Sequence, residues 1–457
     1  MTTTTETSVR AYGSGRTAEE FRRAFLDGRV PVAVYGLGKM GLPLAAVYAE
    51  VTGNVRGADV DPSVVEAVNR GDCPVSGEPD LPELLARLRD AGSLTATASP
   101  EEAAREARVH VLVVPTVLRE DRTPDLSALD AAVDDVGSGL EAGDAVFVES
   151  TVPPGTCEGR VGPRLEAASG LERGEFGLAF CPERTSSGRA LADIRGSYPK
   201  VVGGIDPEST RVAETVYDEI TDNRVIPVSD ATTAECVKLF EGVYRDVNIA
   251  LANELGTFAE DLGVDVRESI EVANSQPFCD IHDPGPGVGG HCIPYYPWFV
   301  LDRVERDAPL IRTARAVNES MPGFVVERLL AGLDRRGVPA EEARVLLLGV
   351  TYRPGVAETR ESPTYPIATR LTEAGATVYA ADPVLETFPS LDATPVDLDD
   401  ADDLGFDAVA VLTPHDAFDD VDWSSFGELF VLDGRDTIGA DLEGTPHEVY
   451  TVGTGVR

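Results

Sequence analysis

Residues 30–50, VPVAVYGLGKMGLPLAAVYAE, run from an apolar segment through a glycine-spaced turn into a second apolar segment. Gly36, Gly38 and Gly41 stand in the spacing G-L-G-K-M-G directly after the expected strand. In such a turn the first glycine makes the tight bend, the second lets a pyrophosphate approach the backbone, and the third lets helix and strand pack closely. The stretch therefore predicts a strand, a phosphate-binding turn and a helix, as at the start of a doubly wound α/β fold.

An acidic side chain follows at the distance that a dinucleotide site requires. The next expected strand, NVRGADVD, ends near Asp59, about twenty residues after the turn. An acid there can accept both ribose hydroxyls and exclude a 2′-phosphate, which favours NAD over NADP. Leu37, Lys39 and Met40 complete the expected cofactor-binding turn, and Lys39 can offset pyrophosphate charge. The alternative is a glycine turn in another α/β protein.

Further apolar segments predict more strands of the same sheet. They are RVHVLVVP (108–115), DAVFVES (144–150) and GLAFCPE (177–183), with helical segments between them. Short buried strands that alternate with helices give a parallel sheet covered on both faces. Pro115, Thr116 and Thr151 follow two of these strands, at the carboxyl edge where ligands bind, and are expected to contact the cofactor.

The pattern changes after residue 228 and returns near residue 340. Residues 231–263 have apolar positions at helical spacing without proline, which predicts one long helix that joins domains or subunits. We expect an α/β protein with two doubly wound, Rossmann-like parallel-sheet domains joined by this helix and a helical segment. The expected parts are an N-terminal appendage (1–29), an NAD-binding domain (30–228), a central helical and dimerisation segment (229–335) and a second Rossmann-like domain (336–457).

Composition restricts the partners. The net charge of −40 and the pI of about 4.4 argue against nucleic acid and anionic membranes. Only Lys39, Lys200 and Lys238 are lysines among 39 basic residues, and an acidic, lysine-poor chain suggests a cytoplasm at multimolar salt. The six cysteines form no CxxC pair, so we expect reduced thiols and no metal site. No signal peptide or membrane span is indicated, and we expect a cytoplasmic protein.

Three side chains outside the turn are candidates for chemistry. Cys292 lies in PGPGVGGHCIPYYP (284–297), where glycine and proline predict a shaped loop, so it is either a nucleophile or a buried structural thiol. Lys238 is a lysine retained in mid-helix, either for charge chemistry that arginine cannot perform or by chance on a solvated face. Glu183 follows a strand and is either a general base or a surface carboxylate. Lys200 has no interpretation from the sequence.

Taken together, these stretches resemble the UDP-sugar 6-dehydrogenases, which oxidise UDP-glucose or UDP-N-acetylmannosamine. VYGLGKMGLPLA, ESTVPPGT, CPER, KLFEGVYRDVNIALANEL, PGPGVGGHCIP, ETRESP and AADP occur in the family's order after residue 30, and GVGGHCIP is closer to the N-acetylmannosamine branch. The resemblance implies that a hydride passes from the sixth carbon of the sugar to NAD. Cys292 then adds to the aldehyde, a second oxidation gives a thioester, and water with Glu183 as base releases the uronate.

The resemblance also implies further roles. Lys238 would stabilise oxyanions, Thr151 would hold an ordered water, and Arg360 would meet the UDP across the boundary of a homodimer. The remaining positions that the resemblance assigns to substrate binding are Arg184, Asn248, Gly287, Gly289, Gly290 and Arg353.

Four positions depart from the family's pattern. Gly242 stands where the family usually has Asn, Tyr296 where it usually has Asp, and Arg353 where it often has Lys, while SQPFCD lacks an arginine before the cysteine segment. Asn248 or a water could replace the missing Asn. The departures fit a compensated subgroup, another sugar such as UDP-glucose, or a nucleotide-sugar-binding protein that no longer catalyses.

Overall fold

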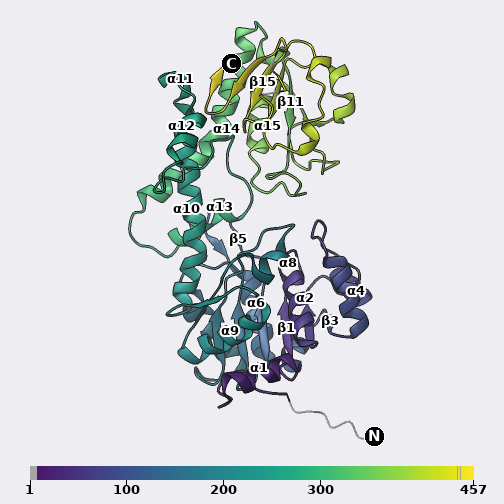
Figure 1. Cartoon of the computed structure of the whole chain (residues 1–457), viewed down its shortest axis with the longest axis vertical. Coiled ribbons are helices and arrows are strands. Elements are labelled where there is room, and N and C mark those ends of the chain that lie inside the picture. Colours follow the sequence, from purple (N-terminus) through teal and green to yellow (C-terminus); the bar gives the residue numbers. More distant parts are fainter. Residues whose placement is uncertain (1–7, 440, 443, 457) are drawn as a thin grey trace. The chain divides into compact units, whose positions relative to one another are not determined.

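The chain folds into two compact units, which a computed structural model describes for residues 8–439, 441–442 and 444–456 (Figure 1). The first unit runs to Phe240 and includes Trp298–Val304, and the second comprises Glu241–Pro297 and the chain from Glu305 onward. Two parallel-sheet domains with a central helical segment were predicted from the sequence, and this architecture is confirmed. The functional boundaries predicted at residues 29, 228 and 335 stay predictions.

The first unit contains an eight-stranded sheet in the order β10-β9-β8-β7-β4-β1-β2-β3. All neighbouring strands are parallel except β8 and β9. The strands are β1 (Val32–Tyr35), β2 (Val55–Ala58), β3 (Leu94–Thr97), β4 (Val109–Leu112), β7 (Ala145–Val148), β8 (Gly177–Phe180), β9 (Lys200–Gly204) and β10 (Val225–Pro227). A separate hairpin pairs β5 (Val117–Leu118) with β6 (Pro124–Asp125).

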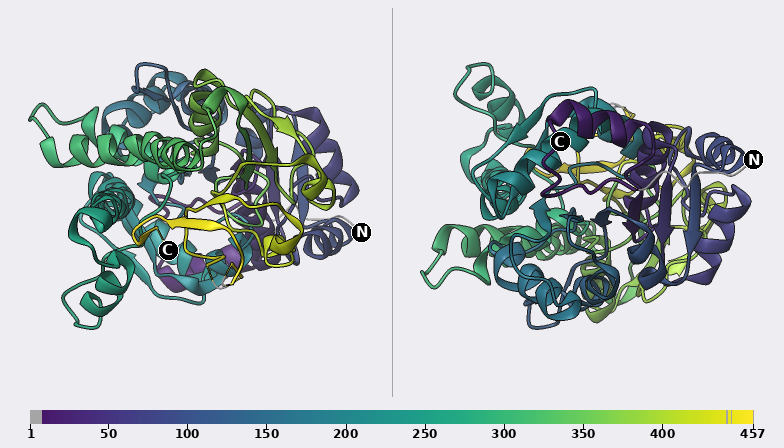
Figure 2. Two further views of the ribbon diagram at one scale, coloured as in Figure 1. Left: turned by 90° about the horizontal axis from the view of Figure 1, so that it is seen from above. Right: turned by 90° about the horizontal axis from the view of Figure 1, so that it is seen from below.

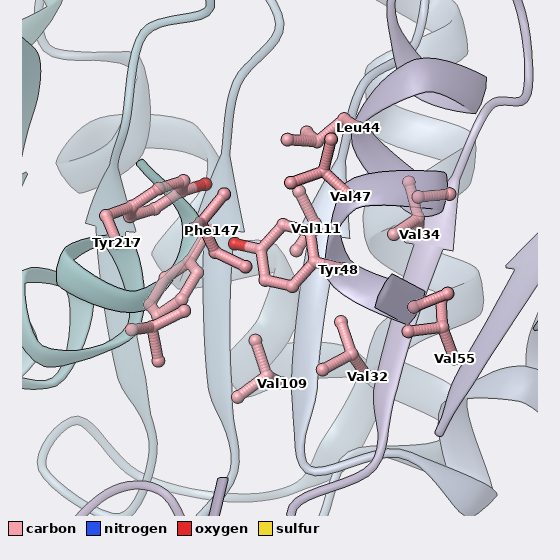
Figure 3. Packing of buried hydrophobic residues seen from close by; sticks show 14 of the residues in the cluster. Val32, Val34, Leu44, Val47, Tyr48, Val55, Val109, Val111, Phe147 and Tyr217 are labelled. Carbon is pink, nitrogen blue, oxygen red and sulfur yellow. The ribbon is translucent and has the colours of Figure 1, made fainter. Parts of the chain in front are cut away.

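Helices cover both faces of this sheet. They are α1 (Ala18–Leu26), α2 (Gly41–Thr52), α3 (Pro62–Arg70), α4 (Leu81–Ala91), α5 (Pro100–Glu106), α6 (Ser127–Gly139), α7 (Gly162–Ser169), α8 (Ala190–Ala192), α9 (Pro207–Ile220) and the first part of α10 (Ala231–Thr257). Alternate residues of β1 enter different cores, Val32 and Val34 on one face and Ala33 and Tyr35 on the other. Figure 3 shows the first of these cores, in which Tyr48 of α2 lies among the valines of the central strands.

The segment before residue 30 contributes to this core. Thr17 caps α1 because its side chain accepts a hydrogen bond from the Glu20 amide, and the Glu20 carboxylate in turn accepts from the Thr17 amide. Phe21 and Phe25 on the other face of α1 are buried in the core of the first unit. Over its described part, residues 8–29, the segment is therefore integrated into the domain and is more than the appendage that its polar start suggested.

The second unit repeats the architecture with seven strands in the order β13-β12-β11-β14-β15-β16-β17. Only β16 and β17 pair antiparallel among the described strands of this sheet. The strands are β11 (Arg344–Leu348), β12 (Thr377–Ala381), β13 (Thr394–Pro395), β14 (Ala408–Val411), β15 (Phe430–Asp433), β16 (Glu448–Thr451) and β17 (Gly455–Val456). Alternate residues of β11 again enter two cores, so this sheet is also covered on both faces (Figure 2).

The long helix predicted over residues 231–263 is confirmed as α10, but it ends at Thr257, and a turn at Phe258 separates it from the next helix. The second unit also contains α11 (Ala259–Leu262), α12 (Val266–Ala273), α14 (Pro309–Arg335), α15 (Thr364–Glu373) and the start of α13 (Cys292–Leu301). Within this unit α10 is fastened to α14 by buried polar bonds, in which Arg315 and Asn318 donate to Asp246 Oδ1 over 2.5 and 2.8 Å. Since an unpaired buried carboxylate is costly, these bonds fix the register of the two helices.

No helix in the described part of the chain combines the length and apolar character needed to cross a membrane.

Candidate active site

The glycine turn after β1 has the geometry of a dinucleotide cradle. Gly36 has φ +93°, and a Cβ at this position would overlap the carbonyl oxygen of Val113. A Cβ at Gly41 would overlap the carbonyl oxygen of Gly36, which explains the close packing of α2 on β1. Gly38, by contrast, has no protein atom within 4 Å of a would-be Cβ. The open space at Gly38 therefore lies where a pyrophosphate would approach the backbone.

Asp59 is tied to this turn. Its Oδ2 accepts a hydrogen bond from the Leu37 amide over 2.7 Å, and its Oδ1 accepts from the Asp61 amide over 2.9 Å. The side chain is only half-buried, and a carboxylate has about four lone-pair sites, so Asp59 retains acceptor capacity for ribose hydroxyls. The turn and its acid fit NAD, with Lys39 exposed on the turn beside them.

The next strands along the sheet end at the same edge. The Ser150 hydroxyl accepts from the Val114 amide and donates to the Val114 carbonyl, each over 2.8 Å, and so joins the ends of β4 and β7. Pro115 and Thr116 follow this junction on one side, and Thr151 follows it on the other. The structure thus places these predicted residues at the carboxyl edge of the sheet, where a cofactor is expected to lie.

Glu183 and Lys238, which are 55 residues apart in the chain, lie in contact. The Lys238 ammonium donates to the Glu183 carbonyl oxygen and lies 3.3 Å from Glu183 Oε2. Thr185 donates to Glu183 Oε1 through both its amide and its hydroxyl, the latter over 2.6 Å. The Thr185 hydroxyl also lies 2.9 Å from the sulfur of Met40 in the cofactor turn. Lys238 is buried, so chance retention on a solvated face is excluded.

These contacts set the charge of Glu183. Burial by itself would raise the pKa of the carboxyl group, but the charge of Lys238, the hydrogen bonds from Thr185 and the charge of Lys200 together lower this pKa below its ordinary value. Glu183 is therefore ionised near neutral pH and can accept a proton, as a general base must.

Glu235 is a supporting residue that the sequence did not reveal. It lies on α10 one turn before Lys238, is fully buried, and accepts hydrogen bonds from the amides of Gly155 and Cys157. These bonds hold the segment after Thr151 against the helix that carries Lys238. A glutamate three residues before a lysine is common on helix surfaces, so nothing local distinguished this residue.

Cys292 is the first residue of α13, which corrects the prediction that residues 284–297 form a loop throughout. Prolines are tolerated in the first turn of a helix because its amides have no intrahelical acceptor, so Pro294 does not end the helix. Pro297 lies deeper, yet α13 continues to Leu301. The thiol consequently stands at a helix N-terminus, where the partial positive charge of the helix favours an anion.

The neighbours of Cys292 in the second unit are polar. The hydrogen bond between His291 and Cys292 raises the pKa of the imidazole above its ordinary value, with burial opposing the shift. His291 Nδ1 lies 3.9 Å from Glu358 Oε1, and Arg360 Nε lies 3.8 Å from the same oxygen. Cys292 is half-buried, unlike the fully buried Cys157 and Cys181.

The glycines before Cys292 are explained by contacts within the protein. A Cβ at Gly289 would lie 2.6 Å from Tyr352 Cβ, and one at Gly290 would lie 2.9 Å from the Tyr352 ring. The Gly290 amide donates to the Arg360 carbonyl over 2.9 Å. Gly287 has φ +144° and a would-be Cβ 3.0 Å from Pro363. The cysteine segment is thus packed directly against residues 352–363, which carry Arg353 and Arg360.

Residues 350–363 are anchored at their start by an acid–histidine pair. Asp382 Oδ2 accepts from the amides of Val350 and Thr351, each over 2.8 Å, and lies 3.3 Å from His415 Nε2. His415 Nδ1 accepts from the Gly355 amide over 3.3 Å. The loop with the two predicted substrate arginines is therefore held at several points along its backbone.

Two residues predicted to bind substrate, Asn248 and Arg184, form hydrogen bonds with the protein backbone. Asn248 donates to the Asp280 carbonyl over 2.6 Å and accepts from the His282 amide over 2.9 Å, so both ends of its amide fix the segment before the cysteine. It is therefore not available, in this arrangement, as the substitute oxyanion partner. Arg184 donates to the Pro199 carbonyl over 2.9 Å beside Glu183.

Gly242 and Tyr296, two of the departures from the family pattern, touch each other. A Cβ at Gly242 would overlap the Tyr296 ring at Cδ2 and lie 2.9 Å from Cγ and 3.0 Å from Cβ of Tyr296. Tyr296 follows Cys292 by four residues on α13, which places the two side chains on one helix face. With Tyr296 in this position no side chain fits at residue 242, so the two departures form one coupled exchange.

No group of three or more His, Cys, Asp or Glu side chains within residues 8–439, 441–442 and 444–456 is arranged to hold a metal ion.

Comparison with known proteins identifies the class of protein. Models of the UDP-glucose/GDP-mannose dehydrogenase family match the chain in order, with the NAD-binding domain at residues 30–221, the central domain at 232–320 and the UDP-binding domain at 346–440. The chain belongs to this family and is an NAD-dependent nucleotide-sugar dehydrogenase.

Individual members of the family are similar to this chain over most of its length. The UDP-N-acetyl-D-mannosamine dehydrogenase of Pyrococcus horikoshii is 36% identical over 89% of this chain and 96% of its own length. A solved structure of UDP-D-ManNAc dehydrogenase from the same organism has a TM-score of 0.85 at 33% identity, covering 93% of this chain and 100% of that one. A UDP-glucose dehydrogenase structure from Pyrobaculum islandicum has a TM-score of 0.83 at 30% identity, covering 93% and 98%.

Proposed function

We propose that this protein oxidises the 6-hydroxyl of UDP-N-acetyl-D-mannosamine to the carboxylate, with Cys292 as the covalent nucleophile. The observation that carries the proposal is the buried contact of Glu183 with Lys238 beside the cofactor turn. A carboxylate exposed on the surface would not have a buried ammonium group as its partner. The choice of sugar is supported by the similarity to the mannosamine enzyme of P. horikoshii and by the GVGGHCIP sequence.

The proposal assigns each residue a role in an overall removal of four electrons. NAD, when bound, takes up the two electrons removed in each of the two oxidations. Lys238 stabilises negative charge on the sugar oxygen, and Thr151 holds an ordered water. The Cys292 thiolate adds to the aldehyde carbon, and the second oxidation leaves an acyl group on sulfur. Glu183 then takes a proton from water as the C–O bond forms, and the C–S bond breaks to return the thiolate.

The diphosphate of the substrate is assigned to the second unit. Arg353 and Arg360 offer guanidinium groups for the diphosphate on the loop that Asp382 anchors. The backbone of Gly287, Gly289 and Gly290 and the side chains of Arg184, Glu183 and Lys238 complete the proposed substrate contacts. Asn248 contributes only indirectly, through the segment at residues 280–282.

A substrate panel tests the proposal. The purified protein is incubated in molar salt with NAD and each of UDP-N-acetylmannosamine, UDP-glucose and UDP-N-acetylglucosamine. We expect about two NADH per UDP-N-acetylmannosamine consumed, because oxidation of an alcohol to a carboxylate removes four electrons. Cys292→Ser is expected to lower this rate about a thousandfold or more, while Cys279→Ser, at a second half-buried thiol, leaves it unchanged. NADH formation from none of the sugars would contradict the proposal.

UDP-glucose is the second candidate substrate, because the P. islandicum protein whose structure resembles this chain is a UDP-glucose dehydrogenase. The same panel separates the two sugars by their kcat/KM values.

A candidate function of another class is a protein that binds a nucleotide sugar without oxidising it. The coupled departures from the family pattern at Gly242 and Tyr296 favour this alternative. Calorimetry would then detect UDP-sugar binding that is unaffected by Cys292→Ser and unaccompanied by NADH. The double variant Gly242→Asn/Tyr296→Asp is informative in either case. It is expected to fold, whereas Gly242→Asn alone overlaps the Tyr296 ring and is expected to unfold at lower temperature.

We also propose a homodimer formed through α10, in a cytoplasm at high salt. Tyr244 and Leu251 of α10 are 51% and 45% exposed, although apolar helix faces are normally covered. Sedimentation of wild type and Leu251→Arg tests this assembly, and an unchanged, monomeric mass for both would contradict it.

A further inference from the structure

Lys200 is the lysine that the sequence could not explain, and its ammonium group is fully engaged. It donates to Glu149 Oε2 over 2.8 Å, to the Cys181 carbonyl over 2.9 Å and to the Pro182 carbonyl over 3.2 Å. An ammonium has three N–H donors, so each finds one acceptor. The Nζ atom also lies 4.4 Å from the centre of the Tyr217 ring.

Glu149, the partner of Lys200, also accepts a hydrogen bond at its other carboxylate oxygen. Glu149 is buried at the end of β7, and its second oxygen accepts from the Tyr217 hydroxyl. Tyr217 comes from α9 and packs against Phe147 in the core that Figure 3 shows. Lys200 therefore connects a rigid buried acid to a stretch of backbone at the end of β8.

That stretch of backbone leads directly into Glu183. Lys200 holds the carbonyls of the two preceding residues, and Lys238 holds the carbonyl of Glu183 itself. Glu183 and Lys200 both line a cavity of about 40 Å³, to which Met40 of the cofactor turn also contributes. Two of the three lysines in the chain thus converge on three consecutive residues, although 39 residues of the chain are lysine or arginine.

Arginine does not fit this position. A guanidinium directs its donors in one plane, whereas the three acceptors of Lys200 surround a single compact ammonium. A chain that uses arginine at nearly every other basic position has therefore kept lysine where three acceptors from β7 and the end of β8 meet at one point.

We infer that Lys200 is a positioning residue for the Glu183 base: it fixes the backbone at residues 181 and 182 so that the Glu183 carboxylate faces the reacting water. This inference rests on the proposed role of Glu183. The positive charge of Lys200 also favours the ionised carboxylate, so its loss raises the pKa of Glu183 and changes the pH at which the base works.

The test compares Lys200→Met, Lys200→Arg and the double variant Glu149→Gln/Lys200→Met. The double variant removes the unpaired buried charge that would otherwise destabilise the single variant, but it still leaves the carbonyls at 181 and 182 without a donor. Arg195→Met, which removes an exposed charge paired with Glu50 in the same unit, is the matched control.

Two measurements are made on each protein. The first is kcat for NADH formation as a function of pH with saturating UDP-sugar. We expect kcat of the double variant to fall about tenfold to a hundredfold and its acid limb to move to higher pH, with KM for NAD unchanged. Lys200→Arg, which retains the charge, is expected to lower kcat with a smaller shift of the limb. Arg195→Met is expected to match wild type.

The second measurement is independent of turnover. Crystal structures of wild type and the double variant report the position of residues 181–183, which we expect to be displaced in the variant. An undisplaced segment overturns the inference, as does an unchanged pH profile of kcat in an active enzyme. A wild type that oxidises no sugar refutes the proposed function alone, and the inference is then decided by the crystal structures.

Discussion

The strand that leads each sheet, β1 in the first unit and β11 in the second, is followed by a glycine of nearly the same conformation. Gly36 and Gly349 have φ of +93° and +90°, and a Cβ at either would overlap a carbonyl oxygen just after a neighbouring strand of the sheet, that of Val113 after β4 or of Thr413 after β14. The Gly36 amide donates to the Ala58 carbonyl over 2.8 Å, and the Gly349 amide donates to the Ala381 carbonyl over 2.9 Å. The two sheets also share the strand order around these turns.

The two units differ in the surroundings of the acid that follows the second strand of each sheet, Asp59 after β2 and Asp382 after β12. Asp59 is half-buried and accepts from two backbone amides. Asp382 is 8% exposed and accepts from two amides, the Thr351 hydroxyl and His415 on one oxygen alone. The same fold position therefore leaves acceptor capacity for a ligand in one unit and forms a loop anchor in the other, depending on how many protein donors surround the carboxylate.

The largest effect is expected at the close contact of helix and strand in the first unit. Gly41→Ala places a methyl group on the Gly36 carbonyl and is expected to lower the free energy of unfolding by at least about 3 kcal/mol. Gly38→Ala, where the space is open, is expected to change it by less than about 0.5 kcal/mol while weakening NAD binding. Urea unfolding and NAD titration of both variants test this, and equal stabilities would show that the turn is not rigid.

Asp382→Asn is expected to lower the free energy of unfolding by about 1–2 kcal/mol at pH 7, because charge-assisted bonds become neutral ones. In the native protein burial tends to raise the pKa of Asp382, but the bonds from His415 and the loop amides lower it to about 2. This stability is complete above the unfolded-state pKa near 4 and is lost as the pH falls through the native value.

Denaturation followed by tryptophan fluorescence in a Trp298→Phe background measures this effect. The remaining tryptophan, Trp423, is buried in the second unit and reports on its unfolding. The difference between Asp382→Asn and its parent should shrink between about pH 4 and pH 2. A difference that stays constant over this range would mean that Asp382 does not anchor the loop as an anion.

Asp59→Asn is expected to leave stability nearly unchanged and to weaken NAD binding about tenfold, because the ribose hydroxyls lose an anionic acceptor. NADP should then bind better relative to NAD, since the repulsion of its 2′-phosphate is removed. Fluorescence titration with both nucleotides measures the two affinities. Unaltered NAD affinity would assign Asp59 to the turn alone, which would make the two acids alike.

The smallest effect concerns the position in the second unit that corresponds to Gly41. Thr364 at the start of α15 donates its hydroxyl to the Gly349 carbonyl over 2.8 Å, so a side chain replaces the close backbone contact. Thr364→Val keeps the shape and is expected to cost about 1 kcal/mol. Unfolding followed by Trp423 measures it, and a loss as large as that of Gly41→Ala would mean that both turns depend equally on this contact.

Local patterns were sufficient to predict most of the fold. The spacing of Gly36, Gly38 and Gly41, the position of Asp59 and the helical period after residue 231 each belong to one short segment, and all of them are found as expected. The boundary at Cys292 was wrong because glycine and proline predict a loop, while prolines near a helix start are compatible with helix.

The sequence predicted which residues form the candidate site better than it predicted how they contact one another. Lys238 and Glu183 were selected separately, and their contact joins residues 55 positions apart. Lys200, Glu235 and the Gly242–Tyr296 contact gave no local signal, because each acquires its meaning only from a partner brought near by folding. Asn248 shows the converse, since its amide could serve substrate or backbone and only the fold decides between them.

The scarcity of lysine has a practical consequence for chemical labelling. Lys238 is buried and Lys200 is enclosed by three acceptors, whereas Lys39 is exposed on the cofactor turn. Among the side-chain amines, an acylating reagent should therefore react first at Lys39, and bound dinucleotide should shield it. A fluorophore introduced at Lys39 in this way would report occupancy of the cofactor cradle without an engineered cysteine.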